Sequence, residues 1–197
     1  MSDLSREIEF WGDCSNTFHE EEKQLIYASR MGLYASKHGA HPPTFDIGGR
    51  SIIDIGGGPV SLLLKCVNRS KCAVVDPIIP ELPSWVFHRY FNSGIDVMSI
   101  RAEALPHDLS FDEAWIYNVL QHVDDPGCVI RNALIVAKTV RIFEWIDIPA
   151  YEGHPNELRR DDLNRWFNGF GYVHQVNESG AVGTAYYGVF PRRGVEE

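Results

Sequence analysis

A glycine-rich turn between two acidic residues is the part of the sequence with the clearest chemistry. The run SIIDIGGG carries an apolar stretch to Asp54 and continues with Gly56, Gly57 and Gly58. Glycines let a backbone turn sharply and let a ligand approach where a Cβ would clash. A second apolar run ends at Asp76, which lies about 20 residues beyond Asp54, the separation at which an acid accepts the hydroxyl protons of a ribose in open α/β sheets. The pattern predicts a site for a nucleoside-containing cofactor.

The charge of this turn distinguishes between two such cofactors. In this sequence Ser61 occupies the position of the third glycine in the dinucleotide-binding fingerprint G-x-G-x-x-G, so that fingerprint is incomplete. A carboxylate at Asp54 would also repel a pyrophosphate, at a cost on the order of kcal/mol. S-adenosylmethionine carries an ammonium and a sulfonium instead, so an acidic turn favours it over NAD. The structural alternative is that Asp54 caps a helix beginning near Pro59 and Val60.

Alternating strands and crossovers must position these residues. Runs rich in β-branched and aromatic residues predict strands in the order SIIDI, CAVVD, DVMSI, EAWIY and VRIFEW, with YVHQV and AYYGVF closing the chain. The first five are spaced by crossovers, which predicts a parallel sheet with helices on both faces. The last two are joined by NESGAVG, which predicts an antiparallel hairpin at the sheet edge.

Three helices have sequence signals of their own. One of about twenty residues is predicted within residues 15–39, because a cap is available at 15–17 and three glutamates follow near its N-terminus. Asp125 is the expected cap of a second helix, with Pro126 in its first turn. A third is expected to be capped near Asp161 and to end at a glycine.

Four motifs together resemble a known family. DIGGGP, VVDP, RAEALP and FDEAWIYNVLQHVDDP are similar, in order and spacing over about 100 residues, to the successive motifs of class I S-adenosylmethionine-dependent methyltransferases. The N-terminal helix and the closing strand pair also fit that family's layout. The resemblance implies an α/β fold, a single Rossmann-like doubly wound domain with a mostly parallel seven-stranded sheet. Residues 1–44 would be a helical extension forming part of the active-site cover, and 45–197 the methyltransferase domain.

The resemblance also assigns cofactor contacts position by position. Asp54 and the glycine turn would contact the amino-acid end of the cofactor. Asp76 would contact its ribose, and Pro77 and Ile78 would border the adenine. The RAEALP motif would meet the adenine amino group, and the loop after the fourth strand would pass under the methionine part. Independently of the resemblance, Trp11, expected in a loop ahead of the predicted helix, is the best candidate for a lid over the cofactor. The full expected set is Trp11, Asp54, Gly56, Gly57, Gly58, Asp76, Pro77, Ile78, Ala102, Glu103, Asn118, Val119 and Leu120.

Two positions depart from the family pattern. Val60 stands where a third glycine is usual. Arg101 stands where an acid is common in the adenine motif, and Glu103 is the expected replacement. Both departures concern individual contacts more than the choice of cofactor.

Two histidines are candidates for catalysis. Methyl transfer is an in-line displacement, so the protein mainly aligns the nucleophile, and a hydroxyl acceptor also needs a general base. His154, in the Gly/Pro loop after the fifth strand, and His122, in NVLQHV, follow strands whose carboxyl ends face the cofactor. An imidazole titrates near neutral pH and suits this task. The structural alternatives are an exposed loop histidine at position 154 and a packed one at position 122.

The composition of the chain limits the classes of partner and the cellular location that we expect. The 197-residue chain has a net charge of -9, which disfavours nucleic acid as a partner. It has no apolar run of membrane-spanning length and no basic-then-apolar start, so we expect a cytoplasmic protein without a membrane partner. Its four cysteines form no C-x-x-C pair, and its acid pairs are better explained as helix caps, so no metal site is expected.

The sequence therefore predicts a transferase: an S-adenosylmethionine-dependent methyltransferase acting on a small polar metabolite or sugar-type acceptor by O- or N-methylation. The N-P-P-Y motif of DNA amino-methyltransferases and the P-C dipeptide of cytosine C5 enzymes are both missing. One alternative is a regulatory protein that binds S-adenosylmethionine or S-adenosylhomocysteine without catalysis. Another is an enzyme on the same scaffold that transfers an aminopropyl group or oxidises through NAD. The acceptor, the methylated atom and the oligomeric state stay open.

Overall fold

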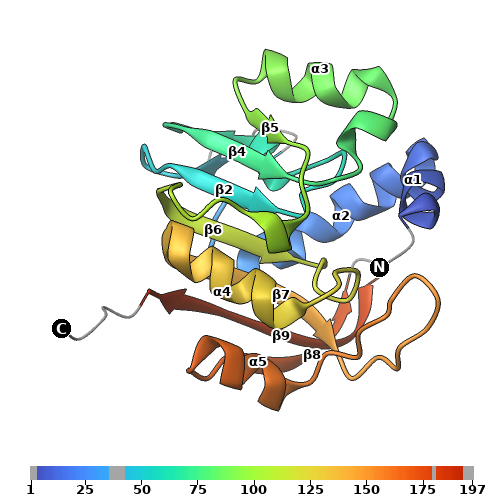
Figure 1. Cartoon of the computed structure of the whole chain (residues 1–197), viewed down its shortest axis with the longest axis vertical. Helices are drawn as coiled ribbons and strands as arrows, with labels where there is room; N and C mark the ends of the chain where they lie inside the picture. The colour runs from blue at the N-terminus through green and yellow to red at the C-terminus, as the bar shows by residue number, and fades with distance from the viewer. Residues whose placement is uncertain (1–3, 36–42, 179–180, 193–197) are drawn as a thin grey trace.

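A seven-stranded sheet forms the centre of the molecule (Figure 1). The computed structural model describes residues 4–35, 43–178 and 181–192. In the sheet the strands follow the order β5-β4-β2-β6-β7-β9-β8. Their bounds are β2 (Ile52–Ile55), β4 (Cys72–Val75), β5 (Asp96–Met98), β6 (Phe111–Tyr117), β7 (Ala137–Ile146), β8 (Tyr172–Glu178) and β9 (Ala181–Pro191). A separate small parallel sheet pairs β1 (Phe45–Asp46) with β3 (Cys66–Val67).

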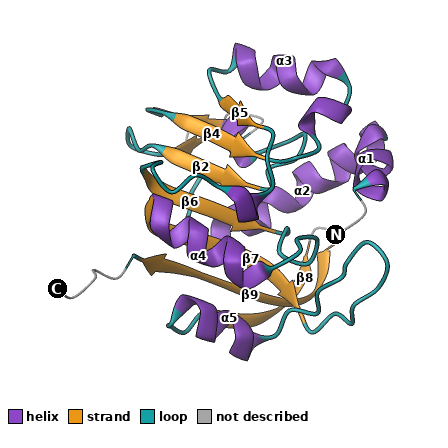
Figure 2. Ribbon diagram, in the orientation of Figure 1, coloured by secondary structure: helices purple, strands orange, loops and turns teal. Residues whose placement is uncertain are grey.

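Helices cover both faces of the large sheet (Figure 2). The helices are α1 (Ser5–Gly12), α2 (Cys14–Arg30), α3 (Ser84–Asn92), α4 (Pro126–Val136) and α5 (Arg160–Phe167). Apolar side chains of α2 and α3 join one buried cluster, and those of α4 and α5 join another on the opposite face. The two-sided burial explains why the central strands are almost continuously apolar. Within the described residues, no helix is long and apolar enough to cross a bilayer.

Parallel pairing brings the functional turns to one edge of the sheet. Ile55 of β2 lies opposite Val75 of β4 and Ile116 of β6. Because the three strands end level with one another, the glycine turn, Asp76 and the loop after β6 all start at the same edge. The expected hairpin is also present: β8 and β9 are antiparallel, and β9 pairs with β7. The predicted fold class is thus confirmed.

The N-terminal segment differs from the prediction. It forms two helices instead of one, because the side chain of Asp13 accepts a hydrogen bond from the backbone N–H of Ser15 (2.8 Å) and caps α2 there. Trp11 consequently lies in α1 and not in a loop. The end of the predicted helix falls partly within residues 36–42, which lie outside the described residues.

The structural alternative for Asp54 and one other local prediction were wrong, and one prediction was confirmed. The leucine-rich run after the glycines forms only a short 3-10 turn, Leu62–Lys65, so no α-helix exists there for Asp54 to cap. In α5, the predicted cap Asp161 lies inside the first turn, and the helix ends at Asn168 in a left-handed conformation instead of at a glycine. The Asp125 cap of α4 is as predicted.

Candidate active site

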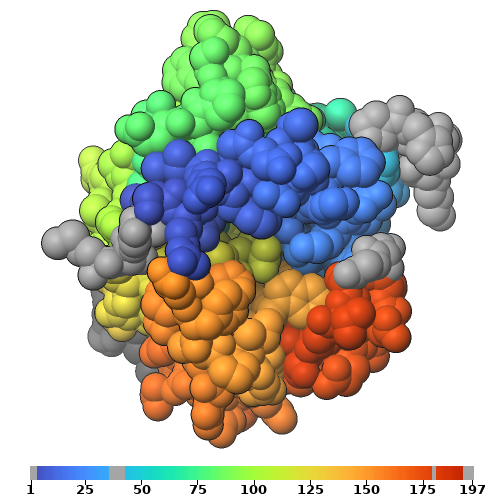
Figure 3. All heavy atoms as spheres, turned by 90° about the vertical axis from the view of Figure 1, so that its right-hand side faces the viewer, coloured from blue at the N-terminus to red at the C-terminus, as the bar shows by residue number. Residues whose placement is uncertain are grey.

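A cavity of about 650 Å³ opens at the carboxyl ends of the central strands. Its walls come from the glycine turn, from segments 75–78 and 101–103, and from the loop after β6. Residues of α1 and α2 line a further side, and the loop that follows β7 lines another. Figure 3 shows this face, with α1 lying directly above the loop that follows β7. The volume is in the range of small-molecule and cofactor sites.

Asp54 lies beneath the glycine turn and does not line the cavity. Its side chain is fully buried, and its Oδ2 accepts hydrogen bonds from Ser61 Oγ and from Tyr117 Oη (2.5 Å). Burial raises the pKa of this carboxyl to about 7. The expectation that Asp54 faces the ligand, and the charge argument against NAD built on it, are therefore corrected: the residue supports the turn from below.

Two tyrosines that the sequence analysis did not identify hold the turn in place. Tyr90 of α3 donates its hydroxyl proton to the carbonyl of Gly58 (2.7 Å) and accepts from the N–H of Ser61 (2.9 Å). Tyr117, besides its bond to Asp54, accepts from the N–H of Leu62 (2.9 Å). These contacts span large separations in sequence, so no local pattern signals them.

Asp76 lines the cavity and also organises the turn. Its two carboxylate oxygens accept from the N–H of Gly58 (2.9 Å) and of Ile78 (3.0 Å). Burial raises its pKa to about 6. Each carboxylate oxygen has a second lone pair, so the residue has remaining capacity to accept from a ligand hydroxyl.

The glycines shape the turn in different ways. Gly56 has φ +75°, and a Cβ there would stand 2.0 Å from Val119 Cγ2, so only glycine fits between the turn and the loop after β6. Gly58 has φ +53°, and a Cβ built on it would meet nothing within 4 Å. Its backbone thus borders open space that a ligand could occupy.

A buried acid holds the loop after β6. Glu144 of β7 accepts through one oxygen from the N–H groups of Val119 and Leu120, both at 3.1 Å. Burial raises the pKa of Glu144 to about 8. Leu120 is fully buried and does not line the cavity, which corrects its assignment as a cofactor contact.

In the RAEALP segment, the side chain of Glu103 forms structural hydrogen bonds. One oxygen of Glu103 accepts from the N–H groups of Asp124 (2.8 Å) and Asp125 (3.2 Å), which ties the segment to the start of α4. Arg101 forms an ion pair with Asp124 (3.1 Å). Glu103 still lines the cavity together with Ala102.

Most of the residues assigned from the sequence meet in this one cavity. The assigned cofactor contacts that line it are Trp11, Gly56, Gly57, Gly58, Asp76, Pro77, Ile78, Ala102, Glu103, Asn118 and Val119, and both candidate histidines, His122 and His154, line it as well. Only Asp54 and Leu120 lie behind its wall. Among the described residues, no group of three or more His, Cys, Asp or Glu side chains is arranged to hold a metal ion.

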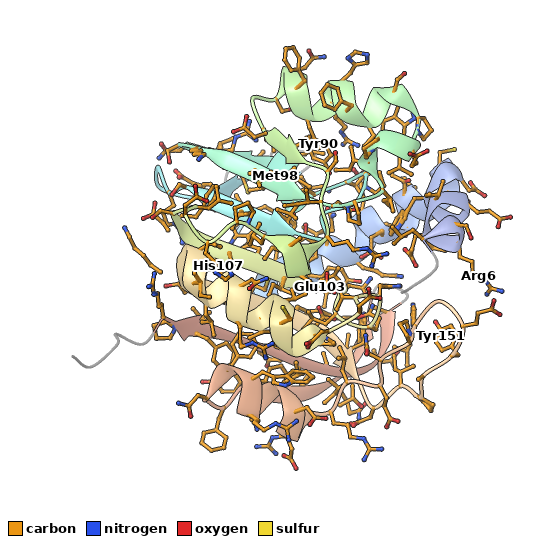
Figure 4. The ribbon with its side chains drawn as sticks, in the orientation of Figure 1. Arg6, Tyr90, Met98, Glu103, His107 and Tyr151 are labelled. Carbon is orange, nitrogen blue, oxygen red and sulfur yellow. The ribbon has the colours of Figure 1, made fainter. Side chains whose placement is uncertain are left out.

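Helix α1 covers the cavity through apolar and polar contacts, and its Ile8 and Trp11 pack against the core cluster of α2 and α3. None of its residues is fully buried. Glu7 accepts from Trp11 Nε1 (3.1 Å) and lies 2.9 Å from His122 Nδ1, and Arg6 pairs with Glu152 of the opposite loop at 2.7 Å. Figure 4 shows Arg6 and Tyr151 on the same side of the molecule, one on α1 and the other on that loop.

The two histidines are neighbours with different titration behaviour. Their ring centroids are 4.3 Å apart, and His122 Nδ1 also lies 2.9 Å from the carbonyl of Gly153. Burial lowers the pKa of His122, but the hydrogen bond and charge of Glu7 outweigh it and raise that pKa overall. Burial and the charge of His122 lower the pKa of His154 to about 4, so His154 is unprotonated at neutral pH.

Comparison with solved structures identifies the fold. An N-methyltransferase, NodS, from Bradyrhizobium japonicum WM9 in complex with S-adenosylhomocysteine has a TM-score of 0.59 at 14% identity, covering 87% of this chain and 85% of its own. Magnesium protoporphyrin IX methyltransferase from Synechocystis PCC 6803, with bound S-adenosylmethionine, has a TM-score of 0.60 at 12% identity and covers 90% and 81%. The fold is that of the class I S-adenosylmethionine-dependent methyltransferases.

Another match to this methyltransferase fold covers nearly the whole chain. An S-adenosylmethionine-dependent methyltransferase from Aquifex aeolicus has a TM-score of 0.58 at 16% identity, covering 96% of this chain and 100% of its own. No protein-family model matches the sequence, and no curated protein matches it either. The similarity is therefore one of backbone architecture and not of sequence.

Proposed function

We propose that the chain binds S-adenosylmethionine in this cavity and transfers its methyl group to a small-molecule acceptor. The observation that carries the proposal is the cavity itself, which brings the glycine turn, Asp76 and the loop after β6 together at the carboxyl edge of a methyltransferase-fold sheet. This edge is where open α/β sheets bind their ligands. Residues 1–44 are proposed as the cover and 45–197 as the catalytic domain.

The chain's own residues fit that cofactor. The open space beside Gly58 suits the amino-acid end, and the remaining lone pairs of Asp76 suit a ribose. Pro77, Ile78 and Ala102 offer an apolar border for an adenine ring. S-adenosylmethionine would supply an electrophilic methyl group on a sulfonium. The protein's contribution is to orient the acceptor in line with that methyl group and to keep water out.

The histidines have distinct proposed roles at the acceptor end. His154 is the available proton acceptor, because it lines the cavity and is unprotonated at neutral pH; its low pKa makes it a weaker base than an ordinary imidazole. His122, held by Glu7 and the Gly153 carbonyl, connects α1 to the two loops. A hydroxyl acceptor would use His154 as a base, whereas an amine would not depend on it.

Titration calorimetry with S-adenosylhomocysteine and NAD tests the cofactor. We expect micromolar affinity for S-adenosylhomocysteine and weaker binding of NAD, because Ser61 leaves the dinucleotide fingerprint incomplete. Release of labelled methyl product over a panel of amines and alcohols then tests transfer. Tighter binding of NAD would favour the oxidoreductase alternative, and cofactor binding with no transfer to any acceptor would favour a regulatory protein.

A further inference from the structure

The cavity extends beyond the residues that would hold the cofactor. Segments 75–78 and 101–103 follow β4 and β5 on one side of β2, whereas β7 lies two strands away on its other side. There the carboxyl end of β7 adjoins the start of β9, with which it pairs. We call this part the β7 end of the cavity. Its lining includes Trp145, Ile148, Tyr151, Ala181 and Val182.

The lining of the β7 end is apolar and partly aromatic. Trp145 and Tyr151 bring rings to it, and the other three residues are aliphatic. Aromatic rings pack favourably on one another in offset or edge-to-face arrangements, and small-molecule pockets are lined mainly by such side chains. A ring-bearing acceptor therefore fits this wall better than a strongly hydrated one.

His154 stands beside this apolar wall. Together with Trp145 and Ile148 it also lines a recess of about 40 Å³ that adjoins the cavity. Its ring centroid lies 4.4 Å from that of Tyr151 and 4.3 Å from that of His122. A ring that packs at the β7 end would therefore have the imidazole within reach of its substituents.

A tight turn holds Tyr151 and His154 opposite each other. The backbone N–H of each residue donates to the carbonyl of the other, at 3.0 and 2.9 Å. Between them Gly153 has φ +95°, which residues with a side chain rarely adopt. Tyr151 Oη lies 3.2 Å from His154 Nε2. When Nε2 carries the imidazole proton and donates to this hydroxyl, the lone pair on Nδ1 is the one that can accept a proton.

The charges of the cavity favour an uncharged acceptor. Each lysine and arginine among the described residues that line the cavity is paired with a carboxylate, so an anionic acceptor would have to break a pair. The pairs are Arg6 with Glu152 (2.7 Å), Lys23 with Glu20 (3.5 Å) and Arg101 with Asp124 (3.1 Å). Burial and the charge of His122 lower the pKa of His154 to about 4, and the same surroundings oppose a cationic amine beside it.

The weak basicity of His154 also distinguishes among hydroxyl groups. General-base catalysis depends on how readily the proton passes from the acceptor to the base. A phenol ionises with a pKa of about 10, as the tyrosine side chain does, whereas an aliphatic alcohol is a far weaker acid. A phenol is therefore the better match for this base.

We propose that the acceptor is an uncharged phenol whose ring packs at the β7 end and whose hydroxyl donates to His154. The proposal rests on the proposed methyltransferase function and names the acceptor class for it. Tyr151 is a positioning residue, because it contacts His154 and orients the imidazole.

The transfer step balances without a further reactant. The phenol oxygen forms the new C–O bond as the C–S bond breaks, and the electron pair of that bond goes to sulfur. The hydroxyl proton passes to the imidazole, which releases it to water afterwards. The products are S-adenosylhomocysteine and an aryl methyl ether.

Rates of transfer to matched acceptors test the class. Labelled S-adenosylmethionine is supplied with phenol, cyclohexanol or aniline at neutral pH, and the methylated product is measured. Phenol should react at least about 100-fold faster than cyclohexanol, which is similar in size but has a much less acidic hydroxyl. Phenol should also react faster than aniline, whose lone pair gains nothing from a base.

His154→Ala tests the proton acceptor with two phenols. At about pH 8.5 phenol is mostly protonated, whereas the electron-poor 4-nitrophenol is ionised and needs no base. The substitution should lower turnover of phenol by at least about 100-fold and that of 4-nitrophenol by less than about tenfold. Ile148→Ala is the matched control: it removes part of the apolar wall and should raise the KM of both phenols equally. Equal losses of turnover for the two phenols in His154→Ala would overturn the role of His154.

Two substitutions of Tyr151 separate positioning from packing. Tyr151→Phe keeps the ring and removes the hydroxyl, so kcat for phenol should fall by about threefold to tenfold at unchanged KM. Tyr151→Ala also removes the ring and should raise KM by about twofold to tenfold. A raised KM with unchanged kcat in Tyr151→Phe would show that Tyr151 does not act through His154.

Two results would overturn the acceptor class. One is faster transfer to cyclohexanol, to aniline or to a monosaccharide than to phenol. The other is transfer to some member of an acceptor panel without transfer to either phenol. Failure of the wild-type protein to bind S-adenosylhomocysteine would instead refute the proposed function itself.

Discussion

Replacing Asp54 by asparagine should change how the stability of the ligand-free protein depends on pH. The carboxyl is fully buried, and burial raises its pKa from 3.8 to about 7. Between these two values the folded protein holds a proton that the unfolded chain releases. The contribution of Asp54 to stability is therefore fully present below the unfolded pKa and is lost as the pH rises through the folded pKa.

The size of the effect follows from the same two pKa values. Each pKa unit corresponds to about 1.36 kcal/mol, so the full difference is worth roughly 4 kcal/mol. The Asp54→Asn side chain keeps the shape and an oxygen acceptor for Tyr117 but does not ionise. The unfolding free energy of wild type should therefore fall relative to that of Asp54→Asn between about pH 4 and pH 8, with a slope approaching about 1.4 kcal/mol per pH unit.

Urea unfolding of both proteins across this pH range measures the difference directly. A constant difference between wild type and Asp54→Asn would refute the assignment of a buried, protonated carboxyl. Asp112→Asn is a suitable control, because hydrogen bonds from Lys138 and Ser51 hold the pKa of Asp112 well below its usual range. Its contribution is lost only as the pH falls below about 4, so its difference from wild type should be flat above that pH.

Three further changes test the cavity. Gly56→Ala should abolish S-adenosylhomocysteine binding in calorimetry, because its Cβ would displace Val119 and the loop after β6; unchanged affinity would contradict the close packing at this turn. Asp76→Ala should weaken that binding by about 1 to 3 kcal/mol, since a charged acceptor for the ribose is removed, and an unaltered dissociation constant in a folded variant would place the ribose elsewhere. Glu7→Gln should lower the pKa of His122 measured by NMR, because Glu7 raises that pKa. The substitution should also lower the free energy of unfolding more near pH 6 than near pH 8.5. Equal losses of unfolding free energy at the two pH values would show that the contact contributes little.

The sequence predicts the sheet well because its signals are local. Each strand has its own run of β-branched and aromatic residues, and the spacing between runs dictates parallel pairing with helical crossovers. The residues that follow the strands meet at one edge as a consequence of that pairing. This geometry explains why most of the assigned contacts line one cavity.

What the sequence does not predict depends on contacts between distant segments. The burial of Asp54 requires Tyr117, and the shape of the glycine turn requires Tyr90, neither of which stands near the turn in sequence. Asn118 likewise donates a hydrogen bond to Glu20, about a hundred residues earlier. Helix α1 is not predicted, because none of its residues is fully buried and its contacts are with distant segments: Ile8 and Trp11 pack against the core, and Arg6 and Glu7 contact two loops.

The weak attachment of α1 has a kinetic consequence. Its ion pair from Arg6 to Glu152 joins side chains that are 52% and 77% exposed, and such pairs contribute little and are screened by salt. A molecule bound beneath this helix would leave when the helix detaches, so its residence time would shorten where ions in solution compete with this contact. Raising the salt concentration should therefore speed dissociation, and where release limits the rate, turnover should rise with ionic strength.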